Sequence, residues 1–93
     1  MGYQALVHEQ EDDVAVAVED LSVGKEAKVH CLQGGEDRVV TLVEDIPLGH
    51  KFALCDISKD EKVVKYNAPI GKAIKAIAKG SHVHVHNLKS LRW

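Results

Sequence analysis

The sequence predicts an all-β domain of short strands and tight turns. Two observations carry this prediction: β-branched apolar residues occur in segments too short for a normal helix, and one turn pattern recurs four times between them. At 93 residues the chain is expected to fold as a single domain over 1–93. Helical and 3₁₀ content is expected to be minor.

The recurring turn has an apolar Ile or Leu, two further residues, then Gly or Asp, then a polar pair that leads into a strand. Glycine adopts a positive φ without steric cost, and aspartate tolerates it better than most residues. Because the spacing of the turns is unequal, a solenoid of fixed period is not indicated. We predict a positive φ at Gly24, Gly49, Asp60 and Gly80.

The segments between the turns are predicted strands. An initial strand is expected around 5–8, inside a lead-in over 1–12 that is otherwise exposed and partly mobile. Two strands that flank Gly34 and Gly35 predict a hairpin. Segment 71–79 has a helical composition but is marginally short between two glycines, so we expect mainly strand. The other predicted strands span 14–18, 28–32, 38–43, 51–54, 62–66 and 82–87.

Composition argues against two classes of partner. Lys and Arg number 12 against 14 Asp and Glu, so the net charge of -2 gives no long-range attraction for nucleic acid. Aromatic residues make up 4% of the chain, which is too few for a base-stacking surface. No apolar stretch approaches the ~20 residues of a membrane span, and the N-terminus lacks a signal-peptide pattern. We therefore expect a cytoplasmic protein that binds neither nucleic acid nor membrane.

The two cysteines are Cys31 and Cys55, far apart in sequence and without Cys-x-x-Cys spacing. In a reducing compartment this arrangement predicts two free thiols, buried or half-buried. A zinc site that combines the cysteines with His30 and the C-terminal histidines is a weaker alternative, because zinc sites usually include one close pair of ligands. His8 receives no functional interpretation, and His30 none outside that alternative.

Three of the six histidines, His82, His84 and His86, stand at alternate positions. On a strand they would share one face, while Val83 and Val85 would face the core. Imidazole titrates near neutral pH and can donate, accept or bind a metal. The row therefore predicts a site for a ligand, a metal or a partner, and the alternative is a solvated strand face.

Four short motifs follow one another along the chain: Gly49-His50-Lys51, Lys65-Tyr66, Ile70-Gly71 and His84-Val85-His86-Asn87. Through them the chain resembles the small N-terminal SAF-like domain of a known family, the altronate and galactarate dehydratases. A free-standing small subunit of similar type occurs in sulfolactate sulfo-lyase. The resemblance covers nearly everything over 13–88 and implies a β-clip architecture. Two positions depart from it, since Asn67 and Lys72 stand where the family usually has Gly and Tyr.

This resemblance implies a lyase of sugar-acid metabolism that eliminates water, or sulfite, from a small hydroxy-acid substrate. It also implies a divalent metal, iron or manganese, in the complete enzyme. The family's main catalytic domain is absent from these 93 residues, so it is either a separate polypeptide or another part of a longer chain. We expect a large catalytic subunit as partner and an isolated chain that is inactive.

Elimination creates a dianionic intermediate that needs concentrated positive charge and a general acid for a departing hydroxyl. His82 lies outside the family motif and is expected to be an exposed strand position. His84 and His86 are also candidate metal ligands. The candidate catalytic residues are His50, His84 and His86, and the candidate substrate-binding residues are Lys51, Lys65, Tyr66 and Asn87.

Two other classes of function remain open. One is a non-catalytic SAF-like module for ligand binding or assembly, because the chain shows no pair of close carboxylates and no self-sufficient enzyme site. The other is a stand-alone metal-binding protein that uses His82, His84 and His86. A homo-oligomer is also compatible with the exposed edges of several short strands.

Overall fold

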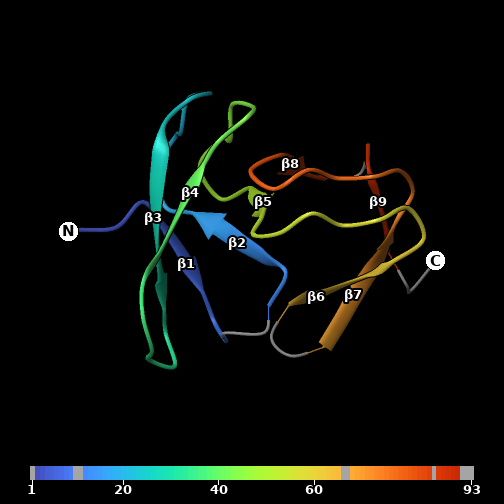
Figure 1. Cartoon of the computed structure of the whole chain (residues 1–93), viewed down its shortest axis with the longest axis horizontal. Helices are drawn as coiled ribbons and strands as arrows, with labels where there is room; N and C mark the ends of the chain where they lie inside the picture. The colour runs from blue at the N-terminus through green and yellow to red at the C-terminus, as the bar shows by residue number, and fades with distance from the viewer. Residues whose placement is uncertain (1, 10–11, 66–67, 85, 91–93) are drawn as a thin grey trace.

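The computed structural model describes residues 2–9, 12–65, 68–84 and 86–90, and within these ranges the regular elements are all β-strands (Figure 1). The all-β prediction is therefore confirmed. No helix long and apolar enough to cross a membrane occurs among the described residues. The strands are β1 (Ala5–Val7), β2 (Val14–Ala17), β3 (Glu26–Cys31), β4 (Arg38–Thr41), β5 (Lys51–Ala53), β6 (Lys62–Lys65), β7 (Ala68–Ala73), β8 (His82–Val83) and β9 (Leu88–Ser90).

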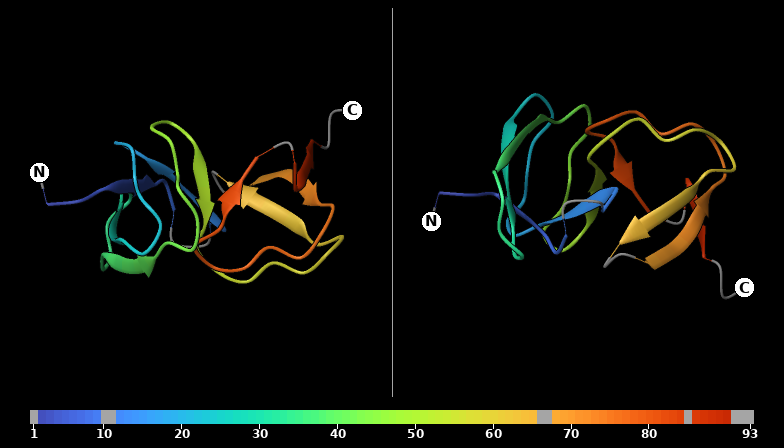
Figure 2. Two further views of the ribbon diagram at one scale, coloured as in Figure 1. Left: turned by 90° about the horizontal axis from the view of Figure 1, so that it is seen from above. Right: turned by 60° about the horizontal axis from the view of Figure 1, so that its bottom comes forward.

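The strands form two sheets that lie side by side along the long axis of the molecule (Figures 1 and 2). The larger sheet has the order β4-β3-β1-β2-β5-β8, and the smaller has the order β6-β7-β9. Every pairing is antiparallel except β1 with β3. β5 and β8 lie between the two ends of the molecule, so side chains on this edge are near both sheets.

Each sheet has its own buried cluster, and β5 contributes to both. Phe52 packs with Leu42 and Ile46 under the larger sheet, whereas Ala53 packs with Val63 under the smaller one. Adjacent side chains on a strand point to opposite faces, which explains how one short strand serves two cores. The residue that precedes β5, His50, is thereby fixed relative to the whole molecule.

The four predicted turns are confirmed. φ is 86° at Gly24, 83° at Gly49, 71° at Asp60 and 87° at Gly80. In each turn the amide after this residue donates to the carbonyl three residues earlier, as His50 N does to Pro47 O at 3.0 Å. The shared geometry follows from the shared residue pattern.

The turns also associate in pairs, which the sequence did not indicate. Leu21 and Ile46 exchange two backbone hydrogen bonds of 2.9 and 2.8 Å, and Ile57 and Ile77 exchange two of 2.8 Å. All four side chains are buried. Each pair of turns therefore holds two segments that are distant in sequence together, through backbone hydrogen bonds and through apolar packing.

Carboxylates reinforce both pairs by accepting hydrogen bonds across them. Asp45 Oδ1 accepts from Val23 N, and Asp20 Oδ1 accepts from Leu48 N, each at 2.8 Å. In the second pair Asp56 Oδ1 accepts from Lys79 N at 2.8 Å. The fourth turn has Ala76 at the position that an aspartate occupies in the other three. In the turn at Asp60, Glu61 Oε1 accepts a hydrogen bond from Ser58 N at 2.9 Å.

Asp13 joins the two sheets. Its backbone N–H donates to Val64 O at 2.8 Å, and its Oδ2 accepts from Val64 N at 2.9 Å. Its carbonyl oxygen accepts from Leu54 N at 2.8 Å. Since β6 carries a bulge between Val63 and Val64, this aspartate supplies partners for backbone groups that the regular ladder leaves free.

The initial strand expected around 5–8 is present as β1, an interior strand of the larger sheet. Outside this strand, the expectation of an exposed lead-in over 1–12 is wrong at Asp12. Asp12 is only 3% exposed, and its Oδ2 accepts from Glu9 N at 3.2 Å. From sequence alone, an acidic residue near a chain end is expected to be exposed to solvent. Here a local turn supplies a hydrogen bond to the buried carboxylate of Asp12.

The predicted strand over 82–87 is too long. β8 ends at Val83, and a turn follows in which the amides of Asn87 and Leu88 donate to His84 O at 3.0 and 2.9 Å. β9 then starts at Leu88, where no strand was predicted. Segment 71–79 is strand only as far as Ala73, after which it bends into the turn at Gly80.

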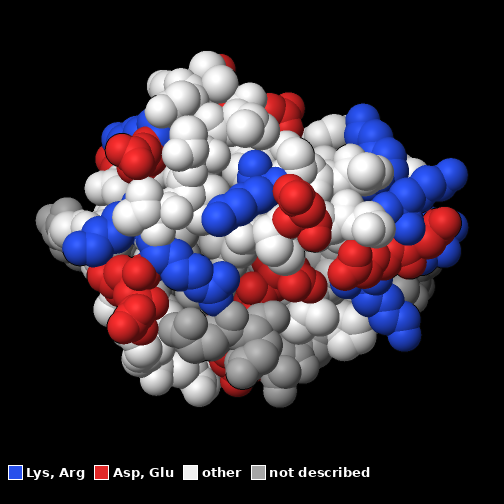
Figure 3. Space-filling view, viewed as in Figure 1, with Lys and Arg blue, Asp and Glu red and all other residues white. Residues whose placement is uncertain are grey.

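Charged side chains of both signs are interspersed over the face drawn in Figure 3. Several form exposed ion pairs, such as Lys25 with Glu19 at 3.8 Å and Lys72 with Asp60 at 3.8 Å. Solvated pairs of this kind contribute little to stability. The paired turns and the two buried clusters are the main sources of stability.

Replacing Gly49 with valine tests the turn geometry. A Cβ at this position meets no atom within 4 Å, so any loss comes from the positive φ alone. We expect Gly49→Val to lower the free energy of unfolding by about 1–3 kcal/mol. Gly49→Asn should lose less, because asparagine tolerates this region of φ. Urea unfolding measures both, and equal stability of the valine variant and the parent would contradict the prediction.

Both cysteines are free, as predicted, with Cys31 buried and Cys55 exposed rather than half-buried. An aromatic disulfide reagent should therefore modify one thiol in the folded protein and two after denaturation. Partial burial and the neighbouring Asp13 raise the pKa of the Cys55 thiol, so it should react more slowly than an unhindered thiol at the same pH. Detection of no free thiol after denaturation would contradict this prediction.

Candidate functional site: a histidine cluster on the β5–β8 edge

The pairing of β5 with β8 creates the candidate site. Phe52 lies opposite His82, and Lys51 lies opposite Val83. Because side chains alternate along a strand, His50 shares a face with Phe52 and therefore with His82. The buried Val83 anchors β8 from its other face. The strand pairing thus brings His50, a candidate catalytic residue, beside His82.

Four imidazoles gather at this edge. His50 Nδ1 lies 2.8 Å from His82 Nε2, and the two rings stack with centroids 5.0 Å apart. The His84 ring stacks on both, at 5.0 Å from His50 and 5.6 Å from His82. The His86 ring lies 5.4 Å from that of His82. We call these four residues the histidine cluster.

The His50–His82 contact limits the charge that the cluster can carry. A hydrogen bond between two ring nitrogens needs one protonated nitrogen and one lone pair. Both rings therefore cannot be fully protonated while this contact lasts. An imidazole nitrogen that keeps its lone pair can accept a proton or bind a metal.

Asn87 holds the turn that presents His84. Its Oδ1 accepts from His84 N at 2.9 Å, and its Nδ2 donates to His82 O at 2.7 Å. The residue is only 4% exposed. Its amide is thus engaged within the chain, and the geometry supports a positioning role rather than the predicted contact with substrate. The same bonds explain why the strand stops, since an asparagine that caps a nearby amide competes with the ladder.

Glu44 is a site residue that sequence reasoning missed. Its Oε1 accepts from His82 N at 3.0 Å, across 38 residues of chain. Burial lowers the pKa of His82, the neighbouring His50, His86 and His84 lower it further, and Glu44 opposes them. No local pattern marks Glu44, because only the folding of the segment after β4 against the turn at Gly80 brings it here.

The structure separates some of the predicted site residues from the cluster. Lys51 starts from the face of β5 opposite to His50. Lys65 lines another hollow together with His8 and Asp12, and no member of the histidine cluster lines it. Tyr66 lies outside the described residues. His82, expected to be an exposed strand position, is half-buried in the middle of the cluster.

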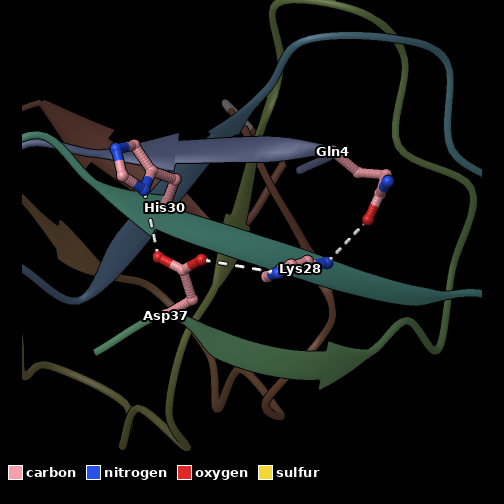
Figure 4. Close-up of polar contacts among 4 residues, drawn as sticks. All are labelled: Gln4, Lys28, His30 and Asp37. Carbon is pink, nitrogen blue, oxygen red and sulfur yellow. Dashed lines mark hydrogen bonds and ion pairs between the residues drawn. The ribbon is translucent and has the colours of Figure 1, made fainter. Parts of the chain in front are cut away.

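The alternative zinc site of cysteines with His30 is not assembled. Cys31 contacts the carbonyl oxygen of His8, and Cys55 contacts Asp13. His30 Nδ1 lies 3.0 Å from Asp37, which also approaches Lys28 (Figure 4). In the described part of the chain, the histidines that converge as metal ligands are His50, His82 and His84.

The fold and the site together define the class of this protein: a small all-β domain that displays imidazole side chains on one edge of a sheet. The chain belongs to the altronate/galactarate dehydratase SAF domain family, whose model matches residues 3–91. The resemblance inferred from the short motifs is therefore confirmed.

Individual relatives differ in how much of them this chain represents. It is 48% identical over 79 residues to altronate dehydratase of Escherichia coli, covering 85% of this chain but 15% of that protein. It is 36% identical over 94 residues to (2R)-sulfolactate sulfo-lyase subunit alpha of Chromohalobacter salexigens, covering all of both chains. Galactarate dehydratase (L-threo-forming) of E. coli is 39% identical over 72 residues, which are 12% of its length. The chain therefore corresponds in extent to a small subunit and to a minor part of the dehydratases.

The environment of His82 predicts its titration. By NMR, the ring should titrate below the ordinary imidazole value, and Glu44→Gln should lower the pKa further by removing the opposing charge. Because the unfolded chain then binds the proton more readily, the contribution of His82 to stability should fall as the pH drops below that ordinary value. A His82 pKa above the ordinary value would contradict the prediction.

Proposed function

We propose that this chain is the small subunit of a lyase that eliminates water or sulfite from a small hydroxy acid. Its active site is completed by a larger catalytic subunit. The observation that carries the proposal is the open histidine cluster on a chain that matches a sulfo-lyase alpha subunit over its full length. Most of the altronate dehydratase chain lies outside the match, which supports the need for a second component. The free thiols fit a cytoplasmic location, which we include in the proposal.

Removal of the proton next to a carboxylate leaves a dianion, which nearby cationic or hydrogen-bonding groups stabilise. His84 and His86 are exposed and can approach a bound acid from this chain. A protonated imidazole can give its proton to a departing hydroxide, whereas sulfite can leave as an anion without one. His50 is half-buried beside them, and its contact with His82 needs a proton on one of the two facing ring nitrogens and a lone pair on the other.

A divalent metal, iron or manganese, forms part of the proposed complete enzyme. Its chemistry there would be to grip the substrate carboxylate and disperse the negative charge that elimination creates. Nitrogen ligands from histidine suit iron better than manganese, which prefers oxygen ligands. The histidine cluster fits iron on that basis.

The proposal predicts that the cluster matters for activity more than for stability. Activity of the complex with the large subunit should fall about 100-fold or more in His86→Ala, which removes an acid or an anion-stabilising group. The melting temperature of the isolated chain should hardly move, since exposed substitutions usually stay within about 0.5 kcal/mol. The matched control is His30→Ala, because His30 contacts Tyr3 and Asp37 instead of the cluster.

Purification of the chain from its native host should recover a larger lyase subunit. Full activity of the complex in both His84→Ala and His86→Ala would contradict the catalytic role and favour a non-catalytic assembly module. Recovery of the chain alone, with lyase activity, would contradict the need for a partner.

A further inference from the structure

The histidine cluster contains three ligands that converge and a fourth imidazole that does not. One ring nitrogen from each of His50, His82 and His84 lies within 4.8 Å of the other two. Three nitrogens bound to one ion at 2.0–2.1 Å would lie about 3.0–3.4 Å apart. The His50 and His82 nitrogens, at 2.8 Å, already have nearly this spacing. Only His84 has to approach, and it is an exposed side chain at a bend.

We propose that this chain by itself binds one divalent transition-metal ion through His50, His82 and His84. The site differs from the row of His82, His84 and His86 noted in the sequence, because it includes His50, which directly precedes β5, and leaves out His86. The inference rests on the geometry of this chain. Only its relevance to catalysis rests on the proposed function.

Two side chains organise the backbone around the ligands. Glu44 accepts from the amide of His82, and Asn87 accepts from the amide of His84. His50 follows the turn at Gly49, whose amide donates to Ala17 O at 2.9 Å. Supporting contacts of this kind raise metal affinity because the ligands lose less freedom on binding. The carboxylate of Glu44 also places negative charge beside the site.

The ligand set predicts the type of metal and of site. Three imidazoles suit Fe²⁺, Co²⁺, Ni²⁺, Cu²⁺ or Zn²⁺, and they disfavour Mg²⁺ and Ca²⁺, which take oxygen ligands. A site with three protein ligands leaves at least one position for water or an anionic oxygen, as catalytic sites do and closed structural sites do not. The exposed His86, whose ring lies 5.4 Å from that of His82, is close to the ligands without being one of them.

Cobalt titration of the tag-free chain tests the proposal. We expect one Co²⁺ per chain, with micromolar or tighter affinity and d–d absorption bands typical of nitrogen ligands. His50→Gln and His84→Gln should each weaken binding by more than about 100-fold, since loss of a ligand exceeds the 10–100-fold effect of losing a supporting contact. His86→Gln and His30→Gln should bind as the parent does. An excess of Mg²⁺ should not compete.

Two results of the titration would overturn the proposal. One is absence of saturable binding at millimolar Co²⁺. The other is loss of binding in His86→Gln together with full binding in His50→Gln. That result would make His82, His84 and His86 the ligand set instead. Paramagnetic shifts of the His50, His82 and His84 ring protons in the unmodified chain provide a readout that needs no variant. Shifts confined to other histidines would also overturn the proposal. Because all readouts use the isolated chain, their failure would leave the proposed lyase role standing.

Discussion

The crossed pairing of the tight turns is the constraint on which this fold depends. The strands have only two to six residues, so their ladders alone offer few hydrogen bonds. The Leu21–Ile46 and Ile57–Ile77 bridges bind distant parts of the chain together, and their apolar side chains are buried at the same points. Asp20 and Asp45 act reciprocally, each capping an amide of the opposite turn. Backbone pairing, burial and capping thus coincide in a few residues.

The same turns determine where the histidines lie. One turn ends at Gly49, directly before His50, and another ends at Gly80, two residues before His82. The strands that start there pair antiparallel, so equivalent turns deliver the two imidazoles to neighbouring positions. Gly80 also lies against the carbonyl of Thr41, so closely that a Cβ at this position would clash with the oxygen. That close approach brings the segment with Glu44 beside the histidines.

Local chemistry made part of this predictable. Positive φ at Asp60 and at the turn glycines follows from residue type, and the strands follow from short β-branched segments. The end of β8 was missed because alternating histidines and valines resemble a strand, whereas the side chain of Asn87 redirects the backbone. Glu44 and the central place of His82 depend on contacts across more than thirty residues, which no local pattern encodes. The order of the motifs identified the family. It also grouped Lys65 with the histidines as a site residue, whereas the fold places Lys65 at a different hollow.

β8 is both the shortest strand and the edge of its sheet in the part of the chain that the structure describes. Strands at edges with few bonds open at much lower free energy than the global unfolding of a domain. β5, by contrast, is locked between two cores through Phe52 and Ala53. The histidine cluster therefore joins one residue beside an interior strand to others on and after an edge strand. Amide hydrogen exchange is expected to be faster in β8 than in β5, although the two strands form one pair.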